Sequence, residues 1–438
     1  MASQYSSFPG MDDILPGEIE KWQWLEEKTR TAFACWGFNE IRTPLLEPTE
    51  LFTRSIGETT DIVHKEMYTF KDRGDRNMTL RPEMTASVAR AVIQNGLLKT
   101  NKFLKLFYTG AMFRAERPQA GRKRQFHQIG AELVNLTRED DPYYADWLIV
   151  RVLINFLDYL KIKNLKFRIN DLTLINGEQA ELVRSKLRKY FESHKSKLDP
   201  DSVYRLDKNV LRIFDSKIET TRALIRDVPW NDIAPFSEEF LKLNKLLQEG
   251  FEGNVSFEID RTLVRGLDYY TGVVFEVASS TLGAQDALAG GGRYDRLYEE
   301  LGSTSTPCTG FSIGMERLLM VLEKNNPTAQ SQMSTKSIYF ASIFPNDNHA
   351  AFLKTVGASR SLTESGFRVI VAEPSPKLGD HLKRASKLGA SYTVIRGDQE
   401  LTEKKWTVKN MMTGDQASIP EGGLLNYLMQ NTKELELP

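Results

Sequence analysis

The spacing of polar side chains in one predicted hairpin is typical of a binding site. Two apolar-rich runs, 107–115 and 126–134, indicate strands joined by a loop. Side chains alternate between the two faces of a strand, so Gln128, Gly130 and Glu132 share one face. This face carries an amide, a gap and a carboxylate, which favours contact with a small polar ligand over burial in an apolar core.

The loop between the two runs is strongly basic. It contains Arg117, Arg122, Lys123 and Arg124, and Arg114 stands at its start. A guanidinium group pairs with phosphate oxygens through two N–H bonds at once. The loop therefore predicts a phosphate-bearing ligand next to the polar one. The alternative is an exposed hairpin with a solvated basic turn.

The bulk composition is that of an ordinary globular protein with two or three domains. The 438 residues are 41% hydrophobic, and 58 Lys and Arg balance 58 Asp and Glu, so only local patches can hold a polyanion. Cys35 and Cys308 lack the paired spacing of a zinc site, and we expect neither a structural metal nor a disulfide. Because the sequence has no apolar signal core and no 18-residue apolar run, we expect a cytoplasmic protein without membrane contact.

Two strings in the chain carry a family resemblance. Residues 113–116, Phe-Arg-Ala-Glu, followed by 124–128, Arg-Gln-Phe-His-Gln, resemble motif 2 of the class II aminoacyl-tRNA synthetases, in the form found in histidyl-tRNA synthetases. Residues 265–270, Arg-Gly-Leu-Asp-Tyr-Tyr, resemble a signature of the histidine-specific branch. This string is the most specific one in the chain.

The other class II motifs have counterparts in the expected order. A helix over 17–36 and a strand ending at Pro44 resemble motif 1, the dimer-forming element, although the residues alone indicate only an amphipathic helix and a strand. Residues 310–314, Gly-Phe-Ser-Ile-Gly, open a helix and resemble motif 3. They also match the G-x-S-x-G elbow of hydrolases, but no lipase-like oxyanion motif precedes them. The resemblance covers roughly residues 9–438.

The resemblance implies an α+β fold with two domains. A class II synthetase catalytic domain, an antiparallel sheet flanked by helices, is expected over 1–325, with a helical insertion at 171–250. The polar residues 326–336 indicate a linker. Alternating strands and helices over 337–438 predict a small α/β domain, which resembles the anticodon-binding domain of these enzymes.

A second group of basic residues surrounds the helix expected at 380–388. A basic helix is usually a solvated face, but the resemblance to an anticodon-binding domain favours contact with RNA phosphates. The group consists of Lys377, His381, Lys383, Arg384 and Lys387.

The resemblance also implies the roles of individual residues. The catalytic residues are expected to be Arg265 and Arg114, which face the charge that develops on the α-phosphate of ATP. Histidine is expected to contact these two arginines and Glu83, Thr85, Gln128, Glu132, Tyr269 and Tyr270. ATP is expected to contact Arg114, Glu116, Phe126 and Arg317, and the tRNA acceptor end to contact Gln119 and Arg122. For Glu83, at the start of an expected helix, a simple capping role stays open.

The implied function is the ATP-dependent activation of L-histidine and its transfer to the 3′ end of histidine tRNA. Mg²⁺ is expected to accompany ATP without a dedicated protein site, and a homodimer is expected through motif 1. The main alternative is a catalytically inactive histidyl-synthetase-like regulatory paralogue. Phosphate-directed arginines together with a C-terminal domain favour the enzyme. The arginines also argue against a pure RNA-binding module, which would not need them.

Overall fold

The computed structural model describes most of the chain in two compact units. One unit comprises the described parts of 1–13 and 26–325, and the other comprises 14–25 and the described part of 326–438. The domain and insertion boundaries stay predictions, and the expected linker lies outside the described residues. The described residues are 5–57, 60, 62–119, 121–176, 179–250, 255–264, 266–283, 286–325, 337–344 and 349–433.

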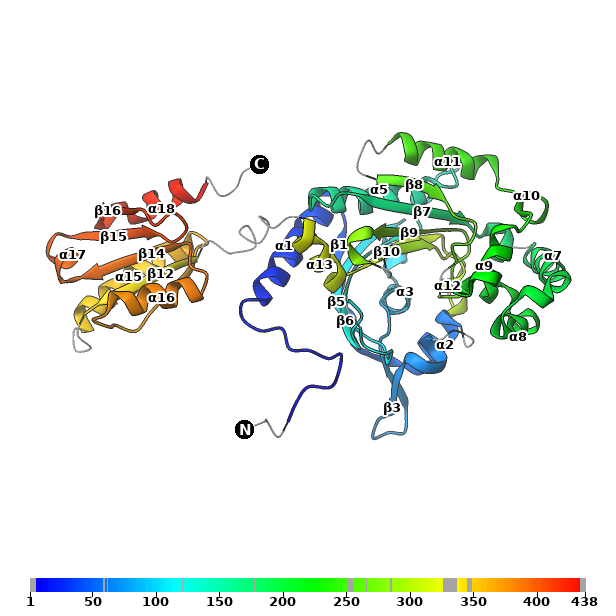
Figure 1. The fold of residues 1–438 in the computed structure, drawn as a ribbon, viewed down its shortest axis with the longest axis horizontal. Helices are drawn as coiled ribbons and strands as arrows, with labels where there is room; N and C mark the ends of the chain where they lie inside the picture. Colours follow the sequence, from blue (N-terminus) through cyan, green and yellow to red (C-terminus); the bar gives the residue numbers. More distant parts are fainter. Residues whose placement is uncertain are drawn as a thin grey trace. The chain divides into compact units, whose positions relative to one another are not determined.

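An eight-stranded sheet forms the centre of the first unit (Figure 1). Neighbouring strands are antiparallel except for the outermost pair at each edge, which is parallel. The predicted antiparallel-rich α+β fold is thereby confirmed. In spatial order the strands are β1 (Asn39–Glu40), β5 (Leu104–Phe113), β6 (Gln125–Val134), β11 (Cys308–Gly314), β10 (Ala287–Arg293), β9 (Val273–Ser279), β7 (Leu165–Asp171) and β8 (Val255–Ile259).

Helices flank this sheet, as Figure 1 shows. No helix in the described ranges is long and apolar enough to cross a bilayer. Those nearest the sheet in the chain are α1 (Ile19–Cys35), α2 (Thr49–Ile56), η1 (Ile62–Glu66), α3 (Thr85–Gln94), α4 (Leu97–Thr100), α5 (Tyr144–Tyr159), α12 (Leu297–Glu300) and α13 (Met315–Asn325).

The two faces of the sheet differ in chemistry because side chains alternate along each strand. On one face, Phe33 of α1 stacks on Phe107 of β5 with ring centroids 5.2 Å apart, and Phe156 of α5 lies 5.3 Å from Phe33. Burial of such rings dominates the stability of a core. The opposite face carries Tyr108 and Glu132, so the polar groups noted in the sequence point away from the aromatic core.

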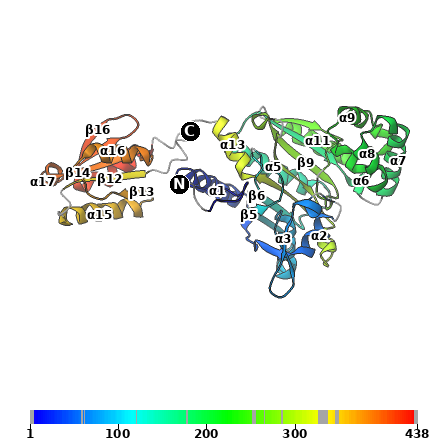
Figure 2. The ribbon, with the colours of Figure 1, turned by 60° about the horizontal axis from the view of Figure 1, so that its bottom comes forward.

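A run of helices connects β7 to β8, and Figure 2 shows much of it gathered beside one end of the sheet. Local signals set its boundaries: for example, Pro200 begins one helix and the Asp199 carboxylate accepts the Ser202 N–H at 2.9 Å. The helices are α6 (Thr173–Asn176), α7 (Ala180–Ser193), η2 (Lys195–Lys197), α8 (Pro200–Lys208), η3 (Val210–Asp215), α9 (Glu219–Arg226), α10 (Trp230–Ile233) and α11 (Glu238–Glu249).

A small antiparallel sheet of β2 (Leu46–Pro48), β4 (Asn77–Leu80) and β3 (Tyr68–Lys71) precedes the main hairpin. The strand predicted to end at Pro44 is wrong, because β1 ends at Glu40. The buried Arg81 guanidinium donates to the carbonyl oxygens of Thr43 at 2.8 Å and of Pro44 at 3.3 Å. These carbonyls therefore bind a side chain instead of a neighbouring strand.

The second unit is a five-stranded sheet covered by helices on both faces. Leu362 and Leu428 pack with Phe340 on one face, and Ala385 packs with Tyr339 on the other. The predicted α/β fold is confirmed. Its strands, in spatial order, are β13 (Arg368–Val371), β12 (Ser337–Ile343), β14 (Tyr392–Gly397), β15 (Lys405–Asn410) and β16 (Gln416–Pro420), and its helices are α15 (His349–Glu364), α16 (Leu378–Lys387), α17 (Asp398–Thr402), η5 (Glu421–Gly423) and α18 (Leu424–Lys433).

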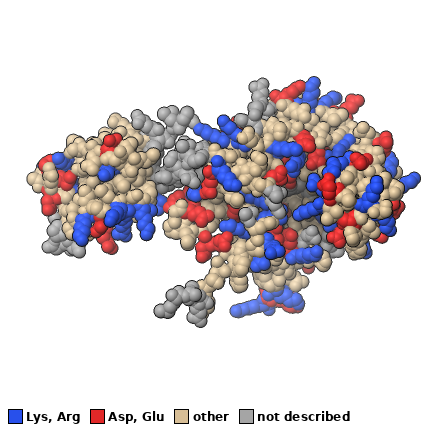
Figure 3. All heavy atoms as spheres, in the orientation of Figure 1, with Lys and Arg blue, Asp and Glu red and all other residues tan. Residues whose placement is uncertain are grey.

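Basic side chains gather along one edge of the second unit in Figure 3, near the place of α16 in Figure 1. Lys377, Lys383, Arg384 and Lys387 are exposed there. His381, which was expected in the same group, is buried, and its Nδ1 lies 3.1 Å from the Tyr339 hydroxyl. The basic surface therefore consists of four residues rather than five.

Candidate active site

Glycines on neighbouring strands create the room for a buried carboxylate. Glu132 on β6 lies opposite Gly310 on β11, and a Cβ at Gly310 would overlap the Glu132 carboxylate. Tyr108 on β5 lies opposite Gly130, and a Cβ there would come within 2.6 Å of Tyr108 Cε2. The gap between Gln128 and Glu132 is thus filled by a tyrosine from the adjacent strand.

Three hydroxyl groups donate hydrogen bonds to Glu132. Tyr294 bonds to Oε2 at 2.5 Å, and Thr85 and Tyr108 bond to Oε1 at 2.9 and 3.4 Å. Burial raises the pKa of Glu132 to about 8, and the neighbouring Glu83 adds to this rise, while the hydroxyls oppose it. In the absence of a ligand, Glu132 therefore holds its proton at neutral pH.

This raised pKa predicts how the stability of the ligand-free protein depends on pH. An unfolded chain releases the Glu132 proton near the ordinary value of 4.5, whereas the folded chain retains it up to about 8. Between these values the free energy of unfolding should fall as pH rises, by about 1.4 kcal/mol per pH unit from this group. Urea unfolding of the wild type and of Glu132→Gln measures it. Parallel curves for the two proteins from pH 4.5 to 8 would contradict the assignment.

Glu83 caps α3 and also faces the cavity. Its two carboxylate oxygens accept the backbone N–H groups of Thr85 and Ala86, both at 2.8 Å. The capping role that the sequence left open is therefore present in the structure. Burial raises the pKa of Glu83, and the helix N–H groups and Arg114 oppose this rise. A second, ligand-binding role of Glu83 stays a prediction.

A cavity of about 110 Å³ lies against this face of the sheet. Gln128 is buried in its wall, and its Oε1 has no hydrogen-bond partner among the described residues. A buried acceptor without a partner is costly unless a ligand supplies the donor. The lining consists of Glu83, Thr85, Tyr108, Arg114, Gln128, Leu267, Tyr269, Tyr270, Tyr294, Gly310, Phe311 and Ser312.

Arg114 is fixed on two sides at the edge of this cavity. Its Nε donates to the Pro82 carbonyl oxygen at 3.0 Å, and its guanidinium lies 5.2 Å from the centroid of the Phe126 ring. Burial lowers its pKa, which Glu66, Glu116 and Glu83 oppose. The rest of the guanidinium fork is thereby oriented in advance, as binding of an anion requires.

The residues expected to contact ATP lie on two elements that touch each other. Arg317 at the start of α13 donates from Nε to the Gly121 carbonyl oxygen at 3.1 Å, and from Nη1 to the Ala287 carbonyl oxygen. Glu116 accepts from Arg122 at 3.3 Å. The helix of motif 3 is therefore tied to the basic loop of motif 2.

The loop tip places both residues expected to contact tRNA. Gln119 and Arg122 exchange backbone hydrogen bonds at 3.0 and 2.9 Å and close a tight turn. Gln119 is exposed and Arg122 is half-buried beside Glu116. Arg122 therefore lies near the expected ATP residues as well, and its assignment to tRNA stays a prediction.

Arg265, the other expected catalytic residue, lies outside the described residues. Its neighbours Val264 and Gly266 are described, and Tyr269 and Tyr270 line the cavity. The convergence of Arg114 and Arg265 on one phosphate therefore stays a prediction.

A glycine substitution tests the packing of this face. Gly130→Ala should destabilise the protein by about 1–3 kcal/mol, because the added Cβ must displace the buried Tyr108 ring. As a control, Gly357→Ala adds a methyl group to an exposed position in α15 with open space around it, and should stabilise by up to about 1 kcal/mol. Calorimetry of the full chain measures both. A neutral effect of Gly130→Ala would show that Tyr108 moves freely.

Two tyrosines of the cavity were not named among the expected site residues, although the resemblance implies that 289–295 forms a wall of the histidine pocket. Tyr108 could have been found by pairing the two predicted strands, since it falls opposite Gly130. Tyr294 follows the glycine run at 290–292, which forms part of strand β10. Tyr294 reaches Glu132 because β10 pairs with β11 in the sheet, and no local pattern predicts that contact.

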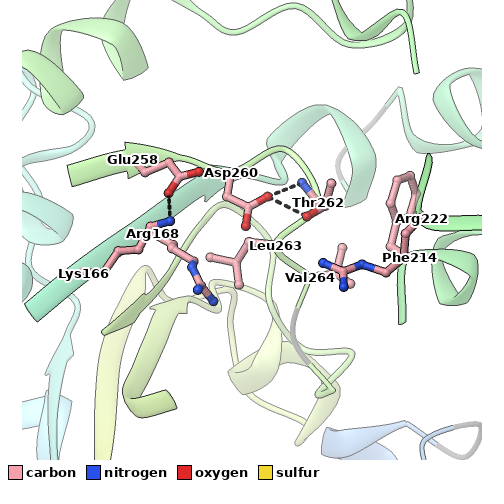
Figure 4. Close-up of a pocket in the computed structure, with 9 residues that line it drawn as sticks. All are labelled: Lys166, Arg168, Phe214, Arg222, Glu258, Asp260, Thr262, Leu263 and Val264. Carbon is pink, nitrogen blue, oxygen red and sulfur yellow. Dashed lines mark hydrogen bonds and ion pairs between the residues drawn. The ribbon is translucent and has the colours of Figure 1, made fainter. Parts of the chain in front are cut away.

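A larger cleft of about 400 Å³ lies near β8, and Figure 4 shows its lining. It lies on the same face of the sheet as the cavity, since Arg168 pairs in register with Glu276, Glu276 with Gly290, and Gly290 with Ser312, which lines the cavity. Lys166 forms an ion pair with Glu258, and Asp260 accepts from Thr262 at 2.9 and 2.6 Å (Figure 4). Because most of its charges are paired within the protein, the smaller cavity is the better candidate site.

The fold is that of the catalytic domain of a class II aminoacyl-tRNA synthetase. A family model described as "Histidyl-tRNA synthetase" matches residues 10–318, and one described as "Anticodon binding domain" matches residues 342–431. The chain therefore belongs to the histidyl-tRNA synthetase family.

Individual relatives are similar to this protein over nearly the whole chain. The chain is 40% identical to a histidine--tRNA ligase of Halothermothrix orenii, covering 96% of this chain and 98% of the relative. It is 40% identical to that of Dictyoglomus turgidum, covering 97% and 98%. The structure of apo S. aureus histidyl-tRNA synthetase matches with a TM-score of 0.70 at 30% identity, covering 97% of this chain and 100% of the other.

A structure from Bacillus halodurans bears on the alternative function. Its name pairs an ATP phosphoribosyltransferase regulatory subunit with a histidyl-tRNA synthetase, and it matches with a TM-score of 0.61. At 23% identity this likeness concerns the fold alone.

Proposed function

We propose that the chain activates L-histidine with ATP, forming histidyl-adenylate and pyrophosphate, and then transfers the histidyl group to the 3′ end of histidine tRNA. The relatives named above are histidine--tRNA ligases. The observation that carries the proposal is a set of three buried acceptors: Glu83 and Gln128 line one small cavity, and Glu132 lies behind it, bonded to Thr85, Tyr108 and Tyr294 of the lining. Histidine supplies an ammonium group and a ring N–H, which are the donors that such acceptors need.

Recognition of the imidazole is assigned to Glu132 and the tyrosines around it. Burial keeps Tyr108 and Tyr294 neutral by raising the pKa of each hydroxyl, so both act as donors to Glu132. Held in this way, the carboxyl group has a fixed direction before histidine arrives. A site built on such hydrogen bonds rejects amino acids that lack the matching ring nitrogen.

Activation requires stabilisation of the charge that develops on the α-phosphate. A carboxylate oxygen of histidine attacks the α-phosphorus and pyrophosphate leaves. Arg114, already fixed by Pro82 and Phe126, would direct its remaining N–H groups to the phosphate oxygens, and we assign Arg265 to the same charge. Glu116, Phe126 and Arg317 would hold ATP.

Magnesium is proposed to arrive with ATP. No group of three or more His, Cys, Asp or Glu side chains in the described part of the chain could hold a metal ion. Mg²⁺ commonly uses one or two carboxylates together with phosphate oxygens. Glu276 and Asp286 pair with Arg168 at 3.2 and 3.0 Å. They also lie close enough to Arg317 to act on its charge, and they would supply such carboxylates once Mg²⁺ competes with Arg168.

Transfer to tRNA, a cytoplasmic location and a homodimer complete the proposal. Gln119 and Arg122 would contact the acceptor end, and the exposed lysines on and beside α16 would contact phosphates of the anticodon arm. The dimer is proposed from the resemblance of residues 17–44 to motif 1. Sedimentation of the purified chain tests it.

Pyrophosphate exchange into ATP, measured with each of the twenty amino acids in turn, tests the activation step. Exchange that depends on histidine alone supports the enzyme. Histidine binding without exchange would instead favour the regulatory paralogue.

A further inference from the structure

One wall of the histidine cavity has little regular structure of its own. Leu267, Tyr269 and Tyr270 line the cavity from the segment 266–272, which contains neither helix nor strand. Within the first unit, the backbone N–H of Asp268 donates to the Ile56 carbonyl oxygen at 3.0 Å. A segment of this kind keeps its shape only where other elements hold it.

The first such element is η3, in the helical run between β7 and β8. Arg212 Nη2 lies 3.2 Å from Asp268 Oδ1 and donates a hydrogen bond to it. Arg212 is itself held, because its carbonyl oxygen accepts from Arg205 at 2.7 Å. On the other side, Asp268 is packed so closely on Gly57 that a Cβ there would lie 2.9 Å from Asp268 Cβ. The carboxylate therefore has a defined position between two elements.

The second element is α6, at the start of the same helical run. Asn176 Nδ2 donates to the Tyr270 carbonyl oxygen at 2.8 Å. The amide oxygen of Asn176 accepts from Arg184 of α7 at 3.4 Å, and its backbone carbonyl accepts from Arg296 at 2.9 Å. Asn176 thus connects a cavity-lining tyrosine to α7.

The helices and the cavity wall also share one apolar core. Leu187 of α7 and Phe214 of η3 belong to the same buried cluster as Tyr269 and Tyr270. Packed cores transmit displacements because they contain few voids. A shift of these helices would therefore move the tyrosines that face the ligand.

We propose that Arg212 and Asn176 are positioning residues that set the affinity for histidine. Through Asp268 and Tyr270 they fix the wall segment 266–272, so the helical run determines the shape of the amino-acid cavity without touching the substrate. This inference rests on the histidine site proposed above. It goes beyond that site because it assigns a substrate effect to residues outside the cavity.

Arg212→Ala, Asp268→Asn and the double variant test the proposal in histidine-dependent pyrophosphate exchange. We expect each single change to raise KM for histidine about threefold to tenfold, with KM for ATP changed less than about twofold. The double variant should be no worse than the more impaired single variant, because both changes act on the same contact: Arg212→Ala removes it, and Asp268→Asn takes away its charge. Arg212→Lys, which retains the charge, should recover part of the loss.

Arg226→Ala is the matched control. It breaks an exposed ion pair with Glu219, 2.6 Å long, on α9 of the same helical run, and should leave both KM values unchanged. If Arg212→Ala fails to fold by thermal melting, Asn176→Ser probes the second contact with the same readout. Additive losses in the double variant, equal rises in both KM values, or no change would overturn the proposal. A wild-type chain that shows no histidine-dependent exchange would instead refute the proposed function.

Discussion

Glu132→Gln is expected to lower kcat/KM for histidine by about 10²–10³-fold while the protein stays folded. Glutamine has nearly the same shape, but it replaces a group that accepts from three hydroxyls and an imidazole N–H with one that offers a single acceptor. In the proposed histidine complex, removal of one partner from a buried hydrogen bond between charged groups costs about 2–5 kcal/mol. Because burial keeps the carboxyl group protonated up to a pKa of about 8, its replacement removes little charge from the ligand-free protein at pH 7. Pyrophosphate exchange against histidine concentration measures the loss.

Glu47→Gln provides the matched control for this change. Glu47 is also a buried carboxylate of the first unit, 4% exposed, but it pairs with Arg90 Nε at 3.1 Å. Glu132 instead bonds to three residues of the cavity lining. Its replacement should lower the melting temperature and leave KM for histidine within about twofold. If the two variants lose activity equally, the effect of Glu132 is on folding and the assignment of histidine recognition to Glu132 is wrong.

Local sequence patterns predicted which side chains form the site better than they predicted which residues contact those side chains. Strand alternation placed Gln128 and Glu132 on one face, and the structure has them there with the aromatic core on the other face. The pattern did not show that Gly310, almost 180 residues later, makes room for Glu132. Contacts of this kind depend on the order of strands in the sheet, which a local pattern does not contain.

The errors have a similar cause. A basic helix predicted His381 in a surface patch, yet helix periodicity turns it inward against Tyr339, since it lies one turn before the buried Ala385. The strand predicted to end at Pro44 does not form, because a distant side chain, Arg81, donates hydrogen bonds to the carbonyl oxygens at its end. In both cases a tertiary contact decided a feature that the local sequence left ambiguous.

Arg114→Lys is expected to lower kcat for histidine-dependent pyrophosphate exchange by about 10²–10³-fold, with a smaller change in KM for histidine. Lysine retains the charge but loses the planar fork and the contact with the Phe126 ring. It also loses the Nε bond to Pro82 that orients the group. Removal of one oriented donor from a site of developing negative charge typically lowers kcat by about this factor. Steady-state kinetics with histidine and with ATP varied separately measure it.

Arg138→Lys separates this effect from the general consequences of losing an arginine. Arg138 also bonds in two places, to Asp140 at 3.0 and 2.7 Å, and lies 5.0 Å from the Tyr144 ring centroid, but its side chain is 49% exposed. Its replacement should change neither kcat nor KM, because an exposed pair contributes little. Were Arg114→Lys to raise KM for histidine with kcat unchanged, Arg114 would only hold the ground-state ligand. The developing charge on the phosphate would then have to be stabilised by other groups.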